Sequence, residues 1–186
     1  AAYALTRFDF PAQNVVLVFI LAGFMIPPQV LLVPLYSLMN TLGLLNTYFA
    51  LIISYLGFSI PFSVFFLRQY FVNIPDVLAE AAQIGGVSEL TIFRRVYLPL
   101  AIPAVSAVVV FQFVLLWNEF LYALVFVSDN SIRPITAGLM TLQGQFTTPW
   151  GVLFAGILIA IIPTVVFFLL FQNQFVRGFT METTDL

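Results

Sequence analysis

The sequence predicts an all-α integral membrane protein: a polytopic helix bundle with an extra pair of helices outside the membrane. The 186 residues are 62% hydrophobic and 8% charged, with a mean hydropathy of +1.08, whereas soluble domains are about one quarter charged. No charged side chain occurs in residues 10–67 or 134–176, and apolar runs of this length are expected in lipid or against other spans. Residues 73–99 are the only stretch in which charged and small residues occur together between two long apolar segments.

Four stretches are long enough to cross a bilayer as helices, which takes about 20 residues. They are residues 12–39, 46–70, 100–127 and 150–172. The short link NTLG between the first two predicts that these are antiparallel neighbours. Residues 1–11 open with AAYALTRF, which we interpret as the cytoplasmic end of a truncated span. We therefore expect a fragment whose N-terminal part is missing.

Glycine and proline recur inside these spans. An internal proline removes a backbone donor, which a membrane helix tolerates where neighbours or water satisfy the freed carbonyl. Prolines are also simply more frequent in membrane helices, so no single one is diagnostic. Taken together they favour a bundle around a cavity: Gly23, Pro27, Pro28, Pro34, Gly57, Pro61, Pro103, Gly156 and Pro163.

Arginine placement predicts the orientation. All six cations are arginines, and with four spans every one except Arg133 falls on the same side. Because cytoplasmic loops are enriched in Lys and Arg, that side is expected to be the cytoplasm. Residues 73–99 and the tail 173–186 are then cytoplasmic, and residues 128–149 form an outer, periplasmic or extracellular, loop.

Residues 73–99 read as two short helices joined by a turn. Asn73 or Asp76 can cap the first, with Pro75 in its first turn, and Gly85-Gly86 can end it. Ser88 can cap the second helix, and Pro99 marks the passage into the third span. The helical spacing of apolar residues predicts one stripe on each helix: Val77, Leu78, Ala81 and Ile84, then Leu90, Phe93, Val96 and Tyr97.

Two other interpretations of this helical pair stay open from the residues alone. It could be an amphipathic helix lying on lipid head groups, but such helices carry Lys or Arg along the polar face, and residues 75–86 have neither. It could be a DNA-reading helix-turn-helix, but Arg94 and Arg95 alone cannot supply the phosphate contacts that DNA binding needs. We therefore expect no nucleic acid partner.

The pair closely resembles the EAA loop of ABC-type importer permeases. Glu80-Ala81-Ala82 is followed after three residues by Gly86, and after nine more by VYLP, which ends in Leu98-Pro99. Further stretches across the whole chain resemble carbohydrate-uptake permeases, particularly the smaller permease of the maltose type: AAYALTRFDFP, MIPPQVLLVPLY, LGLLNTY, LRQYF, WNEFLYALV and FVRG. Gln83 and Gly85 depart from the arginine and aspartate of many relatives.

The resemblance implies a type I importer fold and a mechanism. Glu80, Ala81 and Ala82 would dock on a dimer of ATP-binding subunits, Gly86 would make the turn, and Leu98 and Pro99 would brace the element against the third span. A second, different permease chain and an extracytoplasmic solute-binding protein would complete the assembly, in the lipid bilayer of a prokaryotic inner membrane. This chain would bind no cofactor, because the partner ATPase handles ATP and Mg²⁺.

The sequence contains no lysine, histidine or cysteine. This composition independently supports the expectation that a partner, and not this chain, binds ATP. A P-loop GxxxxGK[ST] needs a lysine. Thiolate or imidazole metal sites, and nucleophiles that depend on Cys or His, are also excluded for this stretch. We accordingly expect a permease subunit and no enzyme active site.

Trp117, Asn118 and Glu119 are the candidate residues of the substrate path. A charge at bilayer depth costs about 2.5–3.5 kcal/mol on insertion scales, so Glu119 should face the bundle or water. The three side chains either line the path, where an aromatic face and polar groups suit a sugar, or tie helices together, or Glu119 already reaches the outer interface. The loop 128–149, with its run TLQGQFTTP, either touches the binding protein or merely connects two spans.

The predicted function is the permease subunit of an ATP-driven importer of a sugar or related solute. An ion-coupled secondary transporter is the alternative in another class, and it should show more intramembrane ionisable residues than Glu119. A structural subunit of a larger membrane complex would not need the cytoplasmic helical pair. The sequence does not identify the solute.

Overall fold

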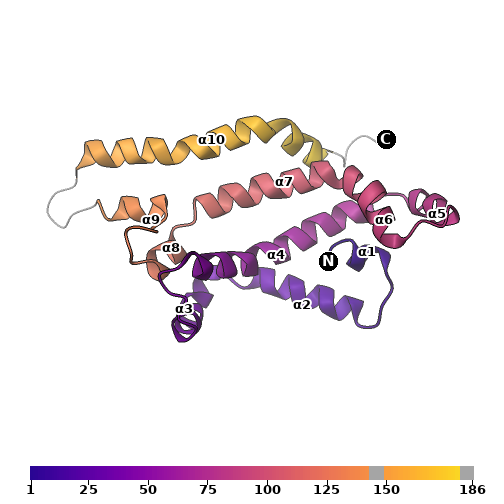
Figure 1. Cartoon of the computed structure of the whole chain (residues 1–186), viewed down its shortest axis with the longest axis horizontal. Coiled ribbons are helices and arrows are strands. Elements are labelled where there is room, and N and C mark those ends of the chain that lie inside the picture. The colour runs from indigo at the N-terminus through magenta and orange to yellow at the C-terminus, as the bar shows by residue number, and fades with distance from the viewer. Residues whose placement is uncertain (143–148, 181–186) are drawn as a thin grey trace. The chain divides into compact units, whose positions relative to one another are not determined.

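The computed structural model describes the backbone of residues 1–142 and 149–180, and the side chains of these residues apart from 81 and 173–180. Every regular element in this part of the chain is a helix. In chain order (Figure 1) they are α1 Ala4–Arg7, α2 Gln13–Met25, the 3₁₀ helix η1 Pro28–Leu31, α3 Leu32–Thr41, α4 Tyr48–Val72, α5 Val77–Ile84, α6 Glu89–Ile92, the π-helix η2 Phe93–Tyr97, α7 Leu98–Trp117, α8 Leu121–Phe126, α9 Ile135–Met140 and α10 Trp150–Thr180.

Three helical stretches are long and apolar enough to cross a membrane: Tyr48–Val72, Glu89–Trp117 and Trp150–Gln172. A fourth is counted if α2 and the helical stretch Pro28–Thr41 form one broken span. The predicted fold class, an all-helical membrane protein, is therefore confirmed. Only 6% of the most apolar window in Trp150–Gln172 is buried inside the chain, so most of that helix must be covered by lipid or by a partner.

The structure divides the predicted span 12–39. Helix α2 ends at Met25, and helical structure resumes at Pro28. Pro27 between them is extended, with φ −60° and ψ 129°. A residue that precedes a proline is sterically driven out of the α region, so the Pro27-Pro28 pair interrupts the helix.

The third span also differs from the sequence prediction, at both ends. Continuous helix begins at Glu89 rather than near residue 100, because α6, η2 and α7 follow one another without a break. The join is a π-turn at Phe93–Tyr97. Pro99 offers no N–H and its ring would clash with the carbonyl one turn earlier, and a wider turn relieves that clash. At the other end, α7 stops at Trp117 instead of continuing to residue 127.

The chain forms two compact units. The first comprises Ala1–Phe24, Ile60–Val110 and Phe171–Leu186, and the second comprises Met25–Ser59 and Phe111–Leu170. The buried core of the first unit joins α1, α4, α5, α6, η2 and α7: Ala2, Leu5, Val64, Phe71, Ile74, Ala79, Ile92, Tyr97 and Ala101. In the same unit, α2 lies close to α4 where an added Cβ on Gly23 would be 3.5 Å from Pro61 Cγ.

The core of the second unit is built around α8. Its buried members are Met39, Ala50, Leu51, Tyr122, Ala123, Phe126, Val127 and Ala137. Helix α9 packs against α10 in this unit, because an added Cβ on Gly156 would collide with Leu139 Cδ2. The outer loop predicted over 128–149 therefore contains a packed helix in its described part. Residues 143–148, which include most of the run TLQGQFTTP, lie outside the described residues.

Candidate functional site

The first candidate site is the element formed by α5, the turn after it, α6 and η2, all in the first unit. Gly86 has φ +71°, in the left-handed region that favours glycine. Its N–H donates to Gln83 O at 2.8 Å, and Val87 N–H donates to Ala82 O at 3.4 Å. Gln83 Nε2 also donates to Glu89 Oε1 at 2.7 Å. The turn that the sequence predicted at Gly85-Gly86 is therefore present, with a side-chain link across it.

The side-chain caps expected for these two helices do not form. Asp76 and Ser88 occupy the N-cap positions, but neither side chain caps its helix. The Asp76 carboxylate instead pairs with the Arg7 guanidinium, and Ser88 Oγ lies 2.9 Å from Thr91 Oγ1. Asp76 has φ −64° and ψ −29°, in the helical region rather than the extended region typical of a capping residue, and its carboxylate binds the distant arginine instead.

The described members of the predicted apolar stripe of α5, which are Val77, Leu78 and Ile84, are exposed. Ala79 is buried in the core of the first unit, whereas Val77 is 69% exposed and Ile84 is 89% exposed. Leu78 is exposed as well. Helix α5 therefore turns its small face inward and leaves a bulky apolar face uncovered.

The structure places the predicted coupling residues as follows. Glu80 is exposed on α5, Ala82 is half-buried against the core, and Gly86 makes the turn. Ala81 lies in α5, but its side chain is outside the described residues. Leu98 and Pro99 are exposed at the start of α7. The residues that anchor the element in the core are Ala79, Ile92 and Tyr97.

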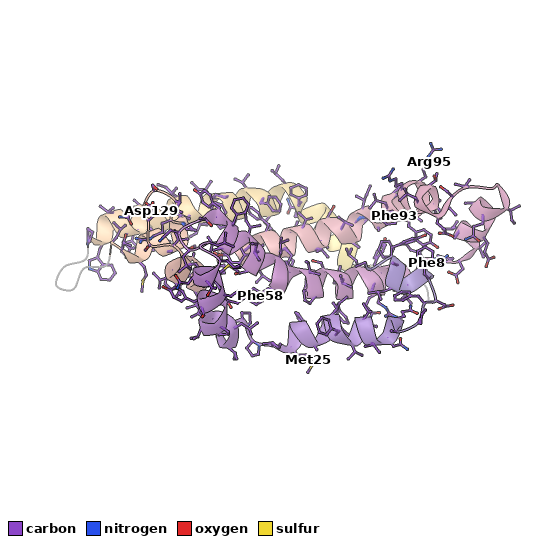
Figure 2. The ribbon with its side chains drawn as sticks, turned by 60° about the horizontal axis from the view of Figure 1, so that its bottom comes forward. Phe8, Met25, Phe58, Phe93, Arg95 and Asp129 are labelled. Atoms are coloured by element: carbon purple, nitrogen blue, oxygen red, sulfur yellow. The ribbon has the colours of Figure 1, made fainter. Side chains whose placement is uncertain are left out.

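An aromatic and ionic cluster that the sequence did not reveal joins α1 to this element. The Tyr3 hydroxyl donates to Glu89 Oε2 at 3.2 Å, and the Arg7 guanidinium carbon lies 4.8 Å from the centre of the Tyr97 ring. The Tyr3 ring contacts Phe93, with centroids 4.8 Å apart. Figure 2 shows Phe93 on the same side of η2 as Phe8, while the exposed Arg95 projects outward.

The second candidate site is centred on Glu119, in the second unit, between the end of α7 and the start of α8. Its carboxylate accepts a hydrogen bond from Tyr55 OH at 2.6 Å, from Tyr122 N–H at 2.8 Å and from Ala123 N–H at 3.2 Å. Glu119 thus supplies the acceptor that α8 needs in its first turn and ties it to α4. The interruption between α7 and α8 frees backbone N–H groups, and the Glu119 side chain accepts their hydrogen bonds, as backbone at membrane depth requires.

The neighbouring candidates also hold helices together. Trp117 Nε1 donates to Ala160 O on α10 at 2.9 Å. Asn118 is exposed, and its Nδ2 donates to Val114 O of its own helix at 2.7 Å. Of the interpretations that the sequence left open for these residues, tying helices together therefore has direct contacts to support it for Trp117 and Glu119.

A cavity of about 420 Å³ also lies beside Trp117 and Glu119. Asn118 is not among the residues that line it. Its wall is mostly apolar, with three aromatic side chains (two of them tyrosines), one carboxylate, one guanidinium and one threonine hydroxyl: Tyr48, Tyr55, Leu116, Trp117, Glu119, Ile132, Arg133, Pro134, Ile135, Thr136, Ile159 and Pro163.

An asparagine pins the segment that follows α8. Asn46 has φ +59°, and its Oδ1 accepts from Ser128 N–H at 2.6 Å, Ser128 Oγ at 2.8 Å and Asp129 N–H at 3.1 Å. The next turn is closed by Asp129, whose pKa is lowered by hydrogen bonds from the backbone and hydroxyl of Ser131, with the nearby Arg133 adding to the effect. Neither residue was singled out from the sequence.

A comparison with family models matches residues 1–180 to the family described as binding-protein-dependent transport system inner membrane component. Among curated proteins, the chain is 44% identical over 96% of its length to a probable ABC transporter permease protein, YurM, of Bacillus subtilis. It is 36% identical over 97% of its length to the trehalose/maltose transport system permease protein MalG of Thermococcus litoralis.

The structure matches a solved bacterial ABC transporter involved in the import of the acidic polysaccharide alginate. The TM-score is 0.75 at 25% identity, over 92% of this chain and 65% of that chain. The chain spans 59% of the length of the Bacillus subtilis relative and 65% of the Thermococcus litoralis relative, or roughly three fifths to two thirds of each.

Proposed function

The chain belongs to the family of binding-protein-dependent transport system inner membrane components, and from this premise we propose that it lines part of the solute path of an ATP-driven importer and is moved by a separate ATPase. The resemblance to ABC-type carbohydrate permeases, read from the EAA pattern, is confirmed by the relatives. Membership also places the chain in a cell membrane, where its long apolar helices belong.

The observation that carries the proposal is the uncovered apolar face of α5. Val77, Leu78 and Ile84 are exposed on a helix that is not among the candidate spans. An apolar face of this kind, on a small-sided helix, suits docking of an amphipathic helix into a groove of another protein. We propose that Glu80, Ala81, Ala82 and Gly86 belong to the surface gripped by an ATP-binding subunit, with Leu98 and Pro99 beside it.

In this proposal α5 and the arginine-rich side of the chain are cytoplasmic. The ATPase dimer binds ATP and Mg²⁺, since the 186 residues of this chain contain no lysine for a P-loop. A second permease chain and an extracytoplasmic solute-binding protein complete the importer. The segment 128–149, part of which is described, is proposed to face that binding protein.

A sugar or related solute is the proposed cargo. One relative is named as a trehalose/maltose permease and another, 37% identical, as an arabinooligosaccharide permease. The cavity beside Glu119 offers Trp117, Tyr48 and Tyr55 as aromatic faces and Arg133 as a hydrogen-bond donor. Few polar groups on an apolar wall are typical of small-molecule sites, so we propose this cavity as part of the path.

The test is site-directed crosslinking in the full-length protein, assembled with its partners. A cysteine at Ile84, which is 89% exposed, should capture the ATP-binding subunit, whereas one at Ala79, buried at 4% on the same helix, should not. The 186 residues contain no cysteine to interfere. Absence of any ATPase adduct from position 84, or uptake that follows an ion gradient without ATP, would refute the proposal and favour a secondary transporter.

A further inference from the structure

We propose that Tyr3 and Arg7 form a clamp that fixes the α5–η2 element to the core of the first unit, so that a displacement of α5 reaches α7. The clamp is defined as Tyr3 and Arg7 together with the residues that they contact, Asp76, Glu89 and Tyr97. This inference rests on the proposed function, because it takes α5 as the part of the chain that the ATPase moves. It assigns a positioning role to residues that precede α2.

Arg7 contacts both ends of the element. Its guanidinium pairs with the carboxylate of Asp76, the residue before α5, and its side chain is 16% exposed against 70% for Asp76. The same guanidinium lies 4.8 Å from the ring centre of Tyr97, the last residue of η2. A cation within about 6 Å of an aromatic face is attracted to it. One side chain therefore holds together the beginning and the end of residues 76–97.

Tyr3 contacts the middle of the same segment, residues 76–97. Its hydroxyl donates to Glu89 Oε2 at 3.2 Å, and Glu89 Oε1 accepts from Gln83 Nε2 at 2.7 Å. The chain of hydrogen bonds thus runs from α1 through α6 to α5. The Tyr3 ring packs on two residues of η2, with centroids 4.8 Å from Phe93 and 5.0 Å from Tyr97.

The α5 end of the element needs such support because α5 itself buries little apolar surface. Helix α5 has eight residues, and a helix this short is marginal without tertiary contacts. Among its described side chains only Ala79 is buried. At the other end, η2 is a π-turn, and the buried hydroxyl of Tyr97 has no hydrogen-bond partner among the described residues, so ring packing and Arg7 hold Tyr97 in place.

Arg7→Gln is the main test, in the full-length permease reconstituted with its ATPase, second permease and binding protein. The variant should lower the solute transported per ATP hydrolysed by about fivefold, the effect of losing one modest interaction. The solute concentration for half-maximal uptake should not change. Arg7→Lys should restore part of the lost transport per ATP. The double variant Arg7→Asp with Asp76→Arg should transport more solute per ATP than either of its single variants. A purely structural role would reduce the yield of complex and leave this ratio intact.

Asp9→Asn is the matched control, since Asp9 is an exposed carboxylate of the same segment. It should transport like the unmodified protein. Tyr3→Phe keeps the ring packing and removes only the hydroxyl bond to Glu89, so its loss should be smaller than that of Arg7→Gln. A ratio unchanged in Arg7→Gln, or equally reduced in Asp9→Asn, would overturn the clamp.

A second readout needs no ATPase. A spin label on a cysteine at Ile84 in the full-length permease, in nanodiscs and with any other cysteine replaced, reports the mobility of α5. Mobility should rise in Arg7→Gln and stay unchanged in Asp9→Asn, and no change in either would again overturn the clamp. If the complex shows no ATPase coupling at all, the proposed function fails, while the label still decides whether Arg7 holds α5.

Discussion

The two units use their few polar side chains differently. In the first unit, half-buried side chains bind exposed carboxylates across long sequence separations, as Arg7 does with Asp76 and Tyr3 with Glu89. In the second unit, Glu119 and Asn46 accept hydrogen bonds from backbone N–H groups where helices stop or turn. The first arrangement links the α5–η2 element to α1. The second satisfies backbone N–H groups that are left free where a helix stops or turns.

The difference follows from the surroundings of each group. A broken helix at membrane depth exposes backbone donors that no water can satisfy, so a nearby carboxylate or amide must accept them. Helix α5 has regular backbone hydrogen bonding of its own but buries little apolar surface. It therefore needs side-chain links to hold its direction, and these links leave its outer face free for a partner.

The largest effect is expected from Glu119→Ala. It removes the acceptor of Tyr55 OH and of two N–H groups, and unsatisfied buried donors cost about 1–3 kcal/mol each. The full-length protein in detergent should lose about 3 kcal/mol of stability, seen as a lower thermal midpoint. Asn118→Ala is the control, because Asn118 is exposed and, within the described residues, its side chain donates to Val114 O of its own helix. Equal thermal midpoints for Glu119→Ala and Asn118→Ala would show that the hydrogen bonds to Glu119 do not stabilise the second unit.

Gly86→Val should affect coupling more than folding. Its φ of +71° costs a residue with a Cβ about 1–2 kcal/mol, although an added Cβ would meet nothing within 4 Å. Binding-protein-stimulated ATPase activity and uptake should fall while membrane insertion is retained. Gly86→Asn should be milder, since asparagine tolerates this conformation. Normal uptake in the valine variant would show that the turn geometry does not matter.

Asn46 allows backbone strain and hydrogen bonding to be separated. Asn46→Asp keeps an acceptor for Ser128 and Asp129, whereas Asn46→Gly relieves the φ of +59° and loses the acceptor. We expect Asn46→Gly to be less stable than the unmodified chain by about 1 kcal/mol, the net value of a lost hydrogen bond. Thermal unfolding of the Asn46→Gly variant and of the unmodified protein measures this difference in stability. A glycine variant as stable as the original would assign the role of Asn46 to its backbone alone.

The smallest effect is a pH dependence at Asp129. Hydrogen bonds from Ser131 lower its pKa below the usual 3.8. A depressed folded-state pKa means that the stabilisation is complete above the unfolded value, near pH 4, and is lost as the pH falls through the lower folded value. The difference in thermal midpoint between the unmodified protein and Asp129→Asn should be constant above about pH 5 and shrink below it. A difference that grows on acidification would contradict this assignment.

Several parts of the candidate sites were predictable from sequence because their signals are local. The Gly85-Gly86 turn follows from the conformational freedom of glycine, and the helices on either side of it follow from apolar spacing and proline placement. The spans were placed by composition, but Pro27-Pro28 ended α2 earlier than the apolar run suggested. Likewise, α7 stopped at Trp117, before Asn118 and Glu119, although residues 120–127 are again apolar.

The remaining contacts could not be predicted because they join residues far apart in the chain. Asp76 is a good capping residue by its position, and nothing local shows that Arg7, 69 residues away, takes its carboxylate instead. Val77, Leu78 and Ile84 have helical spacing that suggests a packed stripe, yet Ala79 is the residue that is buried. Periodicity identifies an apolar face without stating whether the chain itself or a partner covers it.

The sequence by itself determined the membrane class, the existence of long apolar helices and the resemblance to importer permeases, because hydropathy, turn residues and a spaced motif are properties of neighbouring residues. Only the tertiary structure decided that Tyr3 and Arg7 contact the α5–η2 element, that Glu119 accepts hydrogen bonds from the first turn of α8 and from Tyr55, and that α5 presents its bulky face outward. These outcomes depend on which segments approach one another in space, and in an almost uniformly apolar chain many pairings satisfy the same local rules.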